Sequence, residues 1–379
     1  MNKYLFNCST NIGGGTTQNA ANFVALALKD PSVQWHFALS PHVYKDLLAM
    51  GVQPERYQVF ETPSQSPVMR NAVLKYEQSI KPALTYTMAG PAFVKFDSLH
   101  VLGCSNPYVS NLDRMALMCG RNYAQAAVMY LRSRYQLYQF KAAQFWIFQT
   151  ESSRNGFCQT TGISRDKTAV VPNSVGMAFA QGISAPEVRA LPHKGDLRIF
   201  VPSLEYPHKA LHIIPDVAKY LKTKLPELNP LFTLTIYEKS KVFRIIKEKA
   251  RQLGVEDNII NHGHFPYAEA PSLYASCDLV FLPSILEVFS TSYLEAMATG
   301  KPLIVADRPF SREICEQAAL FAKPLDAENS ADLIAELVHD PATVEYLARH
   351  VPRVLAKYKT YETRYANIMN ALQHAAGLQ

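Results

Sequence analysis

Short apolar runs alternate with longer amphipathic stretches along this chain, and the alternation starts twice. The first series opens at residues 4–8 and the second opens at residues 197–201. Short apolar runs separated by helical patterns are typical of a parallel sheet that helices cover on both faces. The chain has 379 residues, and a single core rarely grows past about 250–300 residues. We therefore predict two doubly wound α/β domains.

The stretch 184–195 separates the two series, because it contains Pro186, Pro192 and Gly195 among mixed charges. We predict domains at residues 1–185 and 196–355, and a last helical segment, 356–379, that packs back on the first domain. The predicted strands are residues 4–8, 34–39, 83–87, 99–103, 145–149, 169–171, 197–201, 231–237, 258–261, 279–282 and 302–306. The predicted helices include residues 18–28, 208–222, 242–253, 269–275, 291–299 and most of 331–373.

The net charge of +6 belongs to the first two fifths of the chain. Residues 1–150 hold 13 Lys and Arg against seven Asp and Glu, and residues 114–150 hold five basic residues and no acid. No nucleic-acid recognition motif accompanies this charge, so an anionic membrane surface is the better partner. On one continuous helix Arg114, Arg121 and Arg132 would share a face. An ordinary solvated helix is the alternative.

Several classes of protein are excluded by what the sequence lacks. No apolar run approaches the ~18 residues of a membrane span, and the N-terminal residues lack the apolar stretch of a signal peptide. The six cysteines show no CxxC spacing and indicate thiols in a reducing compartment. No cluster has metal-ligand spacing. We expect a cytoplasmic protein, located in part at the inner face of the plasma membrane.

The most informative local pattern spans residues 283–302. A predicted strand leads into the small-residue turn Ser290–Ser292, which opens a helix. Unpartnered N–H groups and the helix dipole make such a start an anion site. Glu287 and Glu295 flank the turn, and carboxylates accept hydrogen bonds from sugar hydroxyls. The pattern favours a nucleotide-sugar site; the alternatives are a capping box between Ser292 and Glu295 and a solvated surface acid at Glu287.

This pattern resembles the signature of the family-4 type of retaining glycosyltransferases, Glu-x7-Glu followed by Ala-Met-Ala-x-Gly-x-Pro. Residues 11–22, 89–92, 148–151, 171–174 and 307–319 are similar to segments of bacterial surface-polysaccharide members, in the same order. The resemblance implies the GT-B fold, in which two Rossmann-like domains face each other across a cleft. It also implies an acceptor-binding first domain and a donor-binding second domain.

The resemblance implies a role for each matching residue. Glu287 and Lys209 would be catalytic, with Glu287 on the donor sugar and Lys209 on the diphosphate, while Glu295 would bind the ribose. Lys209 follows a helix start predicted at Pro207 and has no following acid, which favours an external anion; a solvated lysine is the alternative. The other predicted donor-binding residues are Gly14, Gly15, Ser203, Tyr237, His264, Phe265, Phe289, Ser290, Thr291 and Ser292, and the predicted acceptor-side residues are Gly13, Ser105 and Asn106.

Several positions depart from the family pattern. Ser203 replaces an arginine that would contact the diphosphate, so Lys209 must suffice or another cation, such as Lys239, must substitute. Ala210 and Ser290 replace glycines, and Ser290 is acceptable only if its backbone allows the same approach to a ligand.

The glycine loop at residues 13–15 matches neither the dinucleotide-binding nor the P-loop motif. Three glycines allow a ligand to approach the backbone closely. The alternative is a tight turn between a strand and a helix.

The resemblance leads us to expect a retaining, metal-independent, hexosyltransferase-like enzyme of surface polysaccharide synthesis. It would use no cofactor, would take a UDP- or GDP-linked sugar as donor, and would transfer it to a glycan or lipid-linked acceptor without involving nucleic acid. The alternatives are a GT-B sugar-nucleotide epimerase, which needs acid and base residues around the sugar, and a catalytically weak binding or partner protein, which the loss of the arginine at Ser203 favours.

Overall fold

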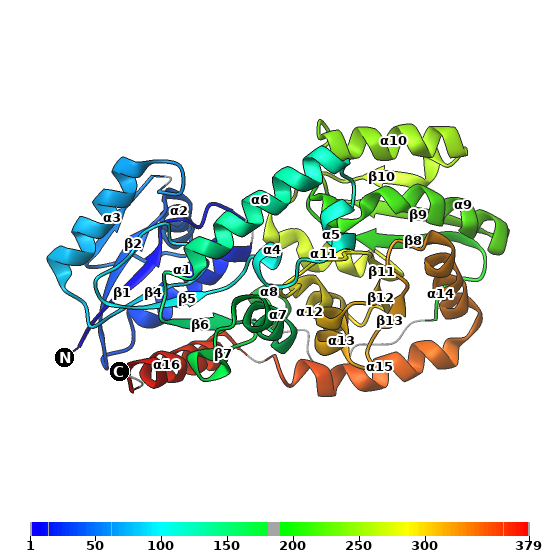
Figure 1. Ribbon diagram of the computed structural model, residues 1–379. Helices are drawn as coiled ribbons and strands as arrows, with labels where there is room; N and C mark the ends of the chain where they lie inside the picture. The colour runs from blue at the N-terminus through cyan, green and yellow to red at the C-terminus, as the bar shows by residue number, and fades with distance from the viewer. Residues whose placement is uncertain (1, 14, 62, 181–189, 359, 378–379) are drawn as a thin grey trace. The chain divides into compact units, whose positions relative to one another are not determined.

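The computed structural model describes residues 2–13, 15–61, 63–180, 190–358 and 360–377. The chain divides into two compact units (Figure 1). The N-terminal unit comprises residues 1–111, 128–172 and 361–379, and the C-terminal unit comprises residues 112–127 and 173–360. Of the predicted linker, residues 184–195, the part from 184 to 189 lies outside the described residues.

The N-terminal unit contains a sheet of seven described strands, all parallel, in the order β3-β2-β1-β4-β5-β6-β7. Along β1, Phe6 packs in one core cluster and its neighbour Leu5 packs in another, on the opposite face. Strands buried on both faces are apolar throughout, which makes them visible in the sequence. The strands are β1 Lys3–Cys8, β2 Gln34–Leu39, β3 Tyr57–Val59, β4 Leu84–Thr87, β5 Leu99–Gly103, β6 Phe145–Phe148 and β7 Thr168–Val170.

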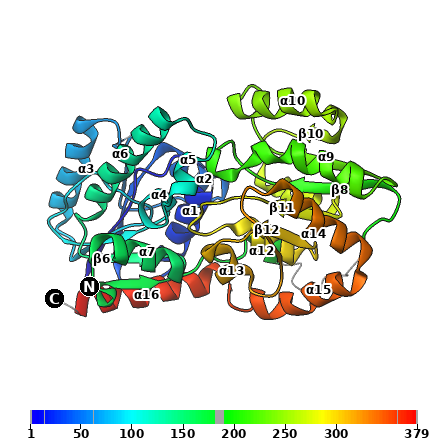
Figure 2. The same ribbon diagram turned by 45° about the vertical axis from the view of Figure 1, so that its right-hand side comes forward.

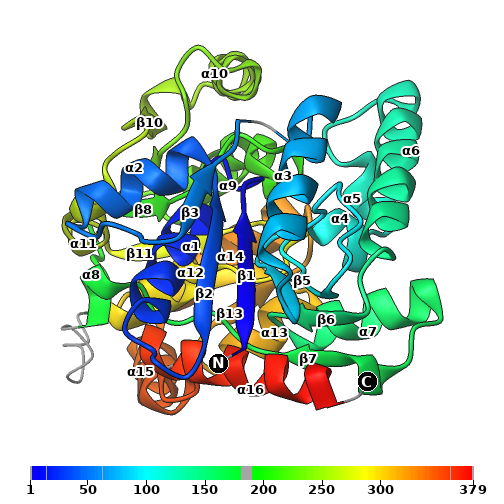
Figure 3. The ribbon, with the colours of Figure 1, turned by 90° about the vertical axis from the view of Figure 1, so that its left-hand side faces the viewer.

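Helices cover both faces of this sheet. The last helix, α16 (Tyr361–Gly377), contacts α1 and β5 and buries Ile368 and Leu372 in the same cluster as Phe6 (Figure 3). The chain therefore returns to the N-terminal unit at its end. The other elements that lie wholly in this unit are α1 Gly15–Ala27, α2 Pro41–Ala49, α3 Pro67–Ile80, α4 Pro107–Ser110, α7 Glu151–Thr161 and η1 Arg165–Lys167.

The C-terminal unit contains six described strands in the order β10-β9-β8-β11-β12-β13, again all parallel. Ile199 and Val201 of β8 face the cluster formed with α9 and α14, which lie side by side, whereas Phe200 faces the cluster formed with α11, α12 and α13 (Figure 2). The strands are β8 Gly195–Val201, β9 Leu228–Leu234, β10 Ile259–Asn261, β11 Leu279–Leu282, β12 Leu303–Ala306 and β13 Leu320–Ala322.

The helices of the C-terminal unit follow its strands and extend to residue 355. They are α8 Met177–Ala180, α9 Ile214–Lys224, α10 Lys241–Leu253, α11 Ala270–Ala275, α12 Thr291–Ala298, α13 Pro309–Cys315, α14 Ala327–His339 and α15 Pro341–Leu355, with 3-10 turns η2 Pro207–Lys209, η3 Leu211–Ile213, η4 Glu256–Asn258 and η5 Tyr267–Glu269.

The segment 112–127 comes from the first half of the sequence but packs within the C-terminal unit. Asp113 forms an ion pair with Arg308, which follows β12, and the Cys119 thiol lies 3.0 Å from the Pro207 carbonyl oxygen. Short helix α5 (Arg114–Met118) starts this segment, and α6 (Tyr123–Phe140) leaves it for the N-terminal unit.

The prediction of one continuous basic helix from residue 114 is wrong. α5 ends at Met118, and the guanidinium of Arg121 donates hydrogen bonds to the carbonyl oxygens of Ala116 and Leu117 near its end. Arg114 and Arg121 therefore do not share a helix face with Arg132, which lies on α6.

Two predicted elements of the C-terminal unit are shifted. The strand expected at residues 231–237 is β9, at Leu228–Leu234. This strand can include Pro230 because β10 pairs with β9 only from Phe232 onward, so no β10 residue lies beside Pro230 to need its missing N–H. The helix expected at residues 208–222 begins at Ile214, because Ala210 adopts a left-handed conformation, with φ of 54°, that ends the preceding turn.

Candidate functional site

Four loops of the C-terminal unit follow the carboxyl ends of β8, β9, β10 and β11. These strands run parallel, so their loops lie along one edge of the sheet. From β8 the strand order continues to β9 and β10 on one side and to β11 and β12 on the other. The gap between β8 and β11 is therefore a topological switch point, where α/β proteins commonly bind ligands.

Lys209 and Glu287 meet at this switch point. Lys209 lies in the turn η2 after β8, Glu287 lies in the loop after β11, and their side chains form an ion pair. The Lys209 side chain is 18% exposed and that of Glu287 is 11% exposed. The Ile285 N–H donates to the His208 carbonyl oxygen across 2.9 Å, which ties the two loops together. No acid follows Lys209 in the sequence, and the structure supplies one from the distant loop that carries Glu287.

His208 lies beside this pair as a neutral group. Burial is the main cause that lowers the pKa of its imidazole to about 4; Glu287 opposes the shift, while Lys209 and Arg121 add to it. Its ring stacks on that of Tyr206, with ring centroids 5.4 Å apart. Near neutral pH His208 therefore adds no charge, and Lys209 is the cation that pairs with Glu287.

Helix α12 begins directly after the loop that carries Glu287. Its N-cap residue Ser290 has φ of −108° and ψ of 113°, an extended conformation that serine adopts without strain. The replacement of the family's glycine is therefore compatible with this backbone. Thr291 and Ser292 occupy the first turn and are partly buried. Their N–H groups belong to the set that finds no partner inside a helix.

Glu295 lies on the second turn of α12 and is only 7% exposed. Its carboxylate accepts hydrogen bonds from the hydroxyls of Tyr274, at 2.9 Å, and Tyr267, at 3.3 Å. The capping-box alternative is wrong, because α12 starts at Thr291 with Ser290 as its N-cap, so Ser292 already lies inside the helix. Burial raises the pKa of the Glu295 carboxyl, and the hydroxyl donors lower it in part.

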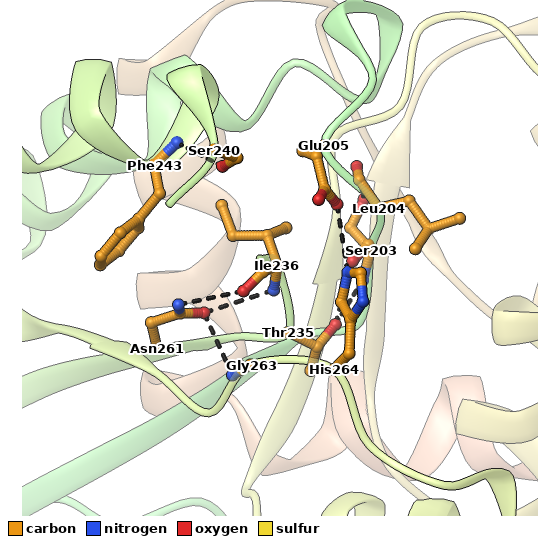
Figure 4. Close-up of polar contacts among 10 residues, drawn as sticks. All are labelled: Ser203, Leu204, Glu205, Thr235, Ile236, Ser240, Phe243, Asn261, Gly263 and His264. Atoms are coloured by element: carbon orange, nitrogen blue, oxygen red, sulfur yellow. Dashed lines mark hydrogen bonds and ion pairs between the residues drawn. The ribbon is translucent and has the colours of Figure 1, made fainter. Parts of the chain in front are cut away.

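The loops after β8, β9 and β10 are joined by side chains that sequence reasoning did not single out (Figure 4). Thr235 Oγ1 accepts from the Ser203 N–H at 2.9 Å and donates to the Ser203 carbonyl oxygen at 3.0 Å. Asn261 Nδ2 donates to the Ile236 carbonyl oxygen at 3.0 Å, and its Oδ1 accepts from the N–H groups of Ile236 and Gly263. Thr235 follows β9 and Asn261 ends β10. A threonine or asparagine at a strand end looks like any turn residue, so the contacts of these two side chains could not be predicted from the sequence.

The remaining residues predicted on the donor side divide into exposed and packed groups. Tyr237 and His264 are exposed, their ring centroids are 6.2 Å apart, and His264 Nε2 lies 3.3 Å from a carboxylate oxygen of Glu205. Phe265 and Phe289 are partly buried against the cluster around Tyr274. These two phenylalanines therefore anchor their loops to the hydrophobic core of the C-terminal unit.

The residues predicted in the N-terminal unit lie after β1 and β5. Gly13 and Gly15 precede and begin α1, and a Cβ atom on either would meet nothing within 4 Å; Gly14 lies outside the described residues. Ser105 is partly buried. Asn106 caps α4 by accepting from the Tyr108 N–H and also donates to Gln136 Oε1 at 2.9 Å. The acceptor-side and donor-side roles of these residues stay predictions.

No group of three or more His, Cys, Asp or Glu side chains placed to hold a metal ion occurs within the described ranges.

Comparison with known proteins identifies the part of the chain that carries these loops. Residues 184–353 match the family model of the glycosyl transferases group 1. The chain therefore contains a region, residues 184–353, that is similar to the group 1 glycosyl transferases, and we call this region the group 1 domain. It is 32% identical over 94 residues to mannosylfructose-phosphate synthase of Agrobacterium fabrum, a match that covers 24% of this chain and 21% of that protein.

Two further matches extend beyond the group 1 domain. The chain is 20% identical over 213 residues to the O-antigen chain mannosyltransferase RfbU of Salmonella typhimurium, which covers 56% of this chain and 53% of RfbU. The solved structure of Anabaena Alr3699/HepE in complex with UDP and glucose has a TM-score of 0.71 and 18% identity, and the match covers 98% of this chain and 100% of that one. This likeness establishes the GT-B fold. The matches to the two curated relatives span about a fifth and about half of their lengths.

Proposed function

We propose that the protein is a retaining, metal-independent glycosyltransferase that moves a sugar from a nucleoside diphosphate donor to a glycan or lipid-linked acceptor in surface polysaccharide synthesis. The observation that carries the proposal is the Lys209–Glu287 pair, which lies at the switch point of the group 1 domain, next to the start of α12. The names of RfbU and of the HepE complex support the acceptor class and the UDP-linked donor class, respectively. We propose that the enzyme requires no cofactor and takes a UDP- or GDP-linked sugar.

The proposed chemistry begins with an exchange of partners at Lys209. A bound diphosphate competes with Glu287 for the ammonium group, and Glu287 is then available to accept hydrogen bonds from hydroxyls of the donor sugar. When the bond between sugar and phosphate breaks, negative charge develops on the leaving diphosphate. Lys209 and the N–H groups at the start of α12 stabilise that charge without reorganising, which is usually the largest contribution to catalysis.

Glu295 completes the donor site by accepting hydrogen bonds from the nucleotide ribose. It lies one helical turn beyond Thr291, on the helix whose first turn we propose as the diphosphate site. The loops that Thr235 and Asn261 hold would then form the surface for the base. Lys239 is exposed in the loop after β9 and is the cation we propose in place of the family's arginine at Ser203.

We also propose that the basic region contacts an anionic membrane surface through α6. Val128, Leu131, Tyr135 and Tyr138 form one stripe along this helix and are 49–72% exposed, and exposed Arg132 and Arg134 flank the stripe. Apolar and aromatic side chains beside arginines suit the interface of an anionic leaflet. Among the described helices, none is both long enough and apolar enough to cross a membrane. This location would bring the enzyme to a lipid-linked acceptor.

One assay separates the transferase from its two alternatives. The purified protein is incubated with UDP- and GDP-linked sugars, with and without a lipid-linked oligosaccharide fraction, and both nucleotide release and sugar products are measured. Acceptor-dependent transfer that survives EDTA and retains the anomeric configuration supports the proposal. Conversion of the donor sugar without acceptor indicates an epimerase, and binding without turnover indicates a partner protein.

A further inference from the structure

Two tyrosines, the buried Tyr274 and the partly buried Tyr267, hold the carboxylate of Glu295. We propose that Tyr274 and Tyr267 are positioning residues, which hold the Glu295 carboxylate and aim it at the ribose of the nucleotide. The inference rests on the proposed function, because it takes Glu295 as the ribose contact. Neither tyrosine was singled out by the sequence, since a tyrosine on a short helix or turn resembles a core residue.

The geometry gives each carboxylate oxygen its own phenol. Tyr274 lies on α11 and donates to one oxygen at 2.9 Å, while Tyr267 lies in η5 and donates to the other at 3.3 Å. The Thr291 hydroxyl, in the first turn of α12, also lowers the pKa of the carboxyl. A carboxylate has about four lone-pair sites, so the two phenols leave about two sites for hydroxyls of the ligand.

The two tyrosine rings are themselves held by packing. Phe200 and Phe179 pack edge-on against the Tyr274 ring, with centroids 5.0 Å and 5.4 Å away. Gly176 makes room for Tyr267, because a Cβ atom at Gly176 would lie 1.6 Å from the Tyr267 hydroxyl. Rigid support of this kind is what a binding group needs to keep its orientation.

Electrostatics explains why the hydroxyl groups around Glu295 are needed. Burial disfavours the ionised form of Glu295 and raises its pKa, and the donations from Tyr274, Tyr267 and Thr291 act in the opposite direction. These three hydroxyls come from α11, η5 and α12, the elements that surround the carboxylate, and no charged side chain from the described residues contributes to the shift. The ionised carboxylate therefore depends on the hydroxyls, and an ionised acceptor makes stronger hydrogen bonds than a neutral one.

The test measures the affinity for UDP and GDP between pH 5 and pH 8 by titration calorimetry, with the full chain. Because burial raises the pKa of Glu295, the wild type should lose affinity on acidification more steeply than Glu295→Gln, which binds weakly and lacks the titrating carboxyl. Tyr274→Phe removes one donation, so the pKa of Glu295 rises further and the fall begins at a higher pH. We expect about a tenfold loss of affinity at neutral pH for this variant, and a smaller loss for Tyr267→Phe.

Two further variants separate positioning from general damage to the core. Tyr358→Phe removes another buried phenol, whose hydroxyl contacts the Ile314 carbonyl oxygen at 3.5 Å, and should leave both affinity and pH profile unchanged. Gly176→Ala should reproduce the Tyr267→Phe profile, because it displaces the same hydroxyl.

Each outcome decides a different claim. If Glu295→Gln loses the pH dependence while Tyr274→Phe keeps the wild-type profile, the tyrosines do not position Glu295 and the inference is overturned, although the proposed function survives. If the wild type binds neither UDP nor GDP, or if Glu295→Gln binds as the wild type does, the proposed nucleotide site itself is wrong and the inference falls with it.

Discussion

Lys209 and Glu287 are 78 residues apart in sequence and form an ion pair at the point where the strand order of the C-terminal unit reverses. The two residues lie on the two loops that a donor would have to contact. It keeps the lysine in place at a site that is largely shielded from water, and a diphosphate is the kind of anion that can replace the carboxylate.

Breaking this pair should damage both stability and binding. Lys209→Met leaves the Glu287 carboxylate without its cation in a mostly buried place. We expect the free energy of unfolding to fall by about 2–3 kcal/mol, somewhat less than for a fully buried pair, and turnover to be lost. Urea unfolding and the transferase assay measure the two effects.

Lys224 provides the control for Lys209. It forms an ion pair with Asp332, but both side chains are more exposed, so Lys224→Met should cost less than about 1 kcal/mol and should leave turnover intact. Equal effects of the two substitutions on turnover would show that Lys209 does not belong to the proposed site.

The clamp between Thr235 and Ser203 should matter for donor affinity. Thr235→Val keeps the shape of the side chain but leaves both the N–H and the carbonyl of Ser203 without their partner. We expect a loss of about 1–3 kcal/mol in stability and a rise in the KM for the donor that exceeds any fall in kcat. The exposed Thr223, whose hydroxyl contacts only a carbonyl of its own helix, gives the control Thr223→Val, and similar KM values for both variants would count against the clamp.

His208 should make the protein acid-sensitive. Its folded-state pKa is about 4, whereas an unfolded histidine titrates near 6.5. Between these values the unfolded chain binds more protons than the folded one, so the free energy of unfolding falls as the pH drops from about 6.5 to about 4. The contribution is roughly 3 kcal/mol over the window.

His208→Gln tests this directly, because glutamine does not titrate. Unfolding curves at pH 7 and pH 4.5 should show a smaller difference for the variant than for the wild type. His100, which is also buried with a lowered pKa, contributes a similar dependence that the variant keeps. An unchanged difference would show that His208 is not protected from protonation.

The stripe on α6 predicts binding to anionic vesicles. Arg132→Glu combined with Arg134→Glu reverses two charges beside the exposed apolar residues and should reduce co-sedimentation with phosphatidylserine vesicles by about tenfold or more. Lys219→Glu with Lys222→Glu makes the same charge change on exposed positions of α9 and should have a smaller effect. Equal losses for the two pairs would indicate attraction by net charge rather than contact through α6.

The sequence revealed the parts of the site that follow local patterns. Buried parallel strands are apolar runs, so the strands that end before Ser203 and Glu287 were visible, and the spacing of Glu287 and Glu295 around a helix start was visible as well. The start of α12 at Thr291 agrees with the prediction.

What the sequence did not reveal depends on contacts between distant segments. The Lys209–Glu287 pair follows from β8 lying next to β11, which no local pattern specifies. The turn at Lys209 was mistaken for a helix, because an alanine gives no sign of the left-handed conformation that Ala210 adopts. Tyr274, Tyr267 and Asn261 act through partners 21 or more residues away in the chain.

The proposed nucleotide-sugar site is tested most directly by a calorimetric titration of the wild type and of Lys209→Ala with UDP, GDP and their sugar derivatives at neutral pH. We predict that at least one nucleoside diphosphate binds the wild type and that Lys209→Ala, shown to be folded by circular dichroism, binds it at least tenfold more weakly. Equal binding by the folded variant, or no binding of any of these ligands to the wild type, would contradict the claim that the switch point of the group 1 domain is a nucleotide-sugar site.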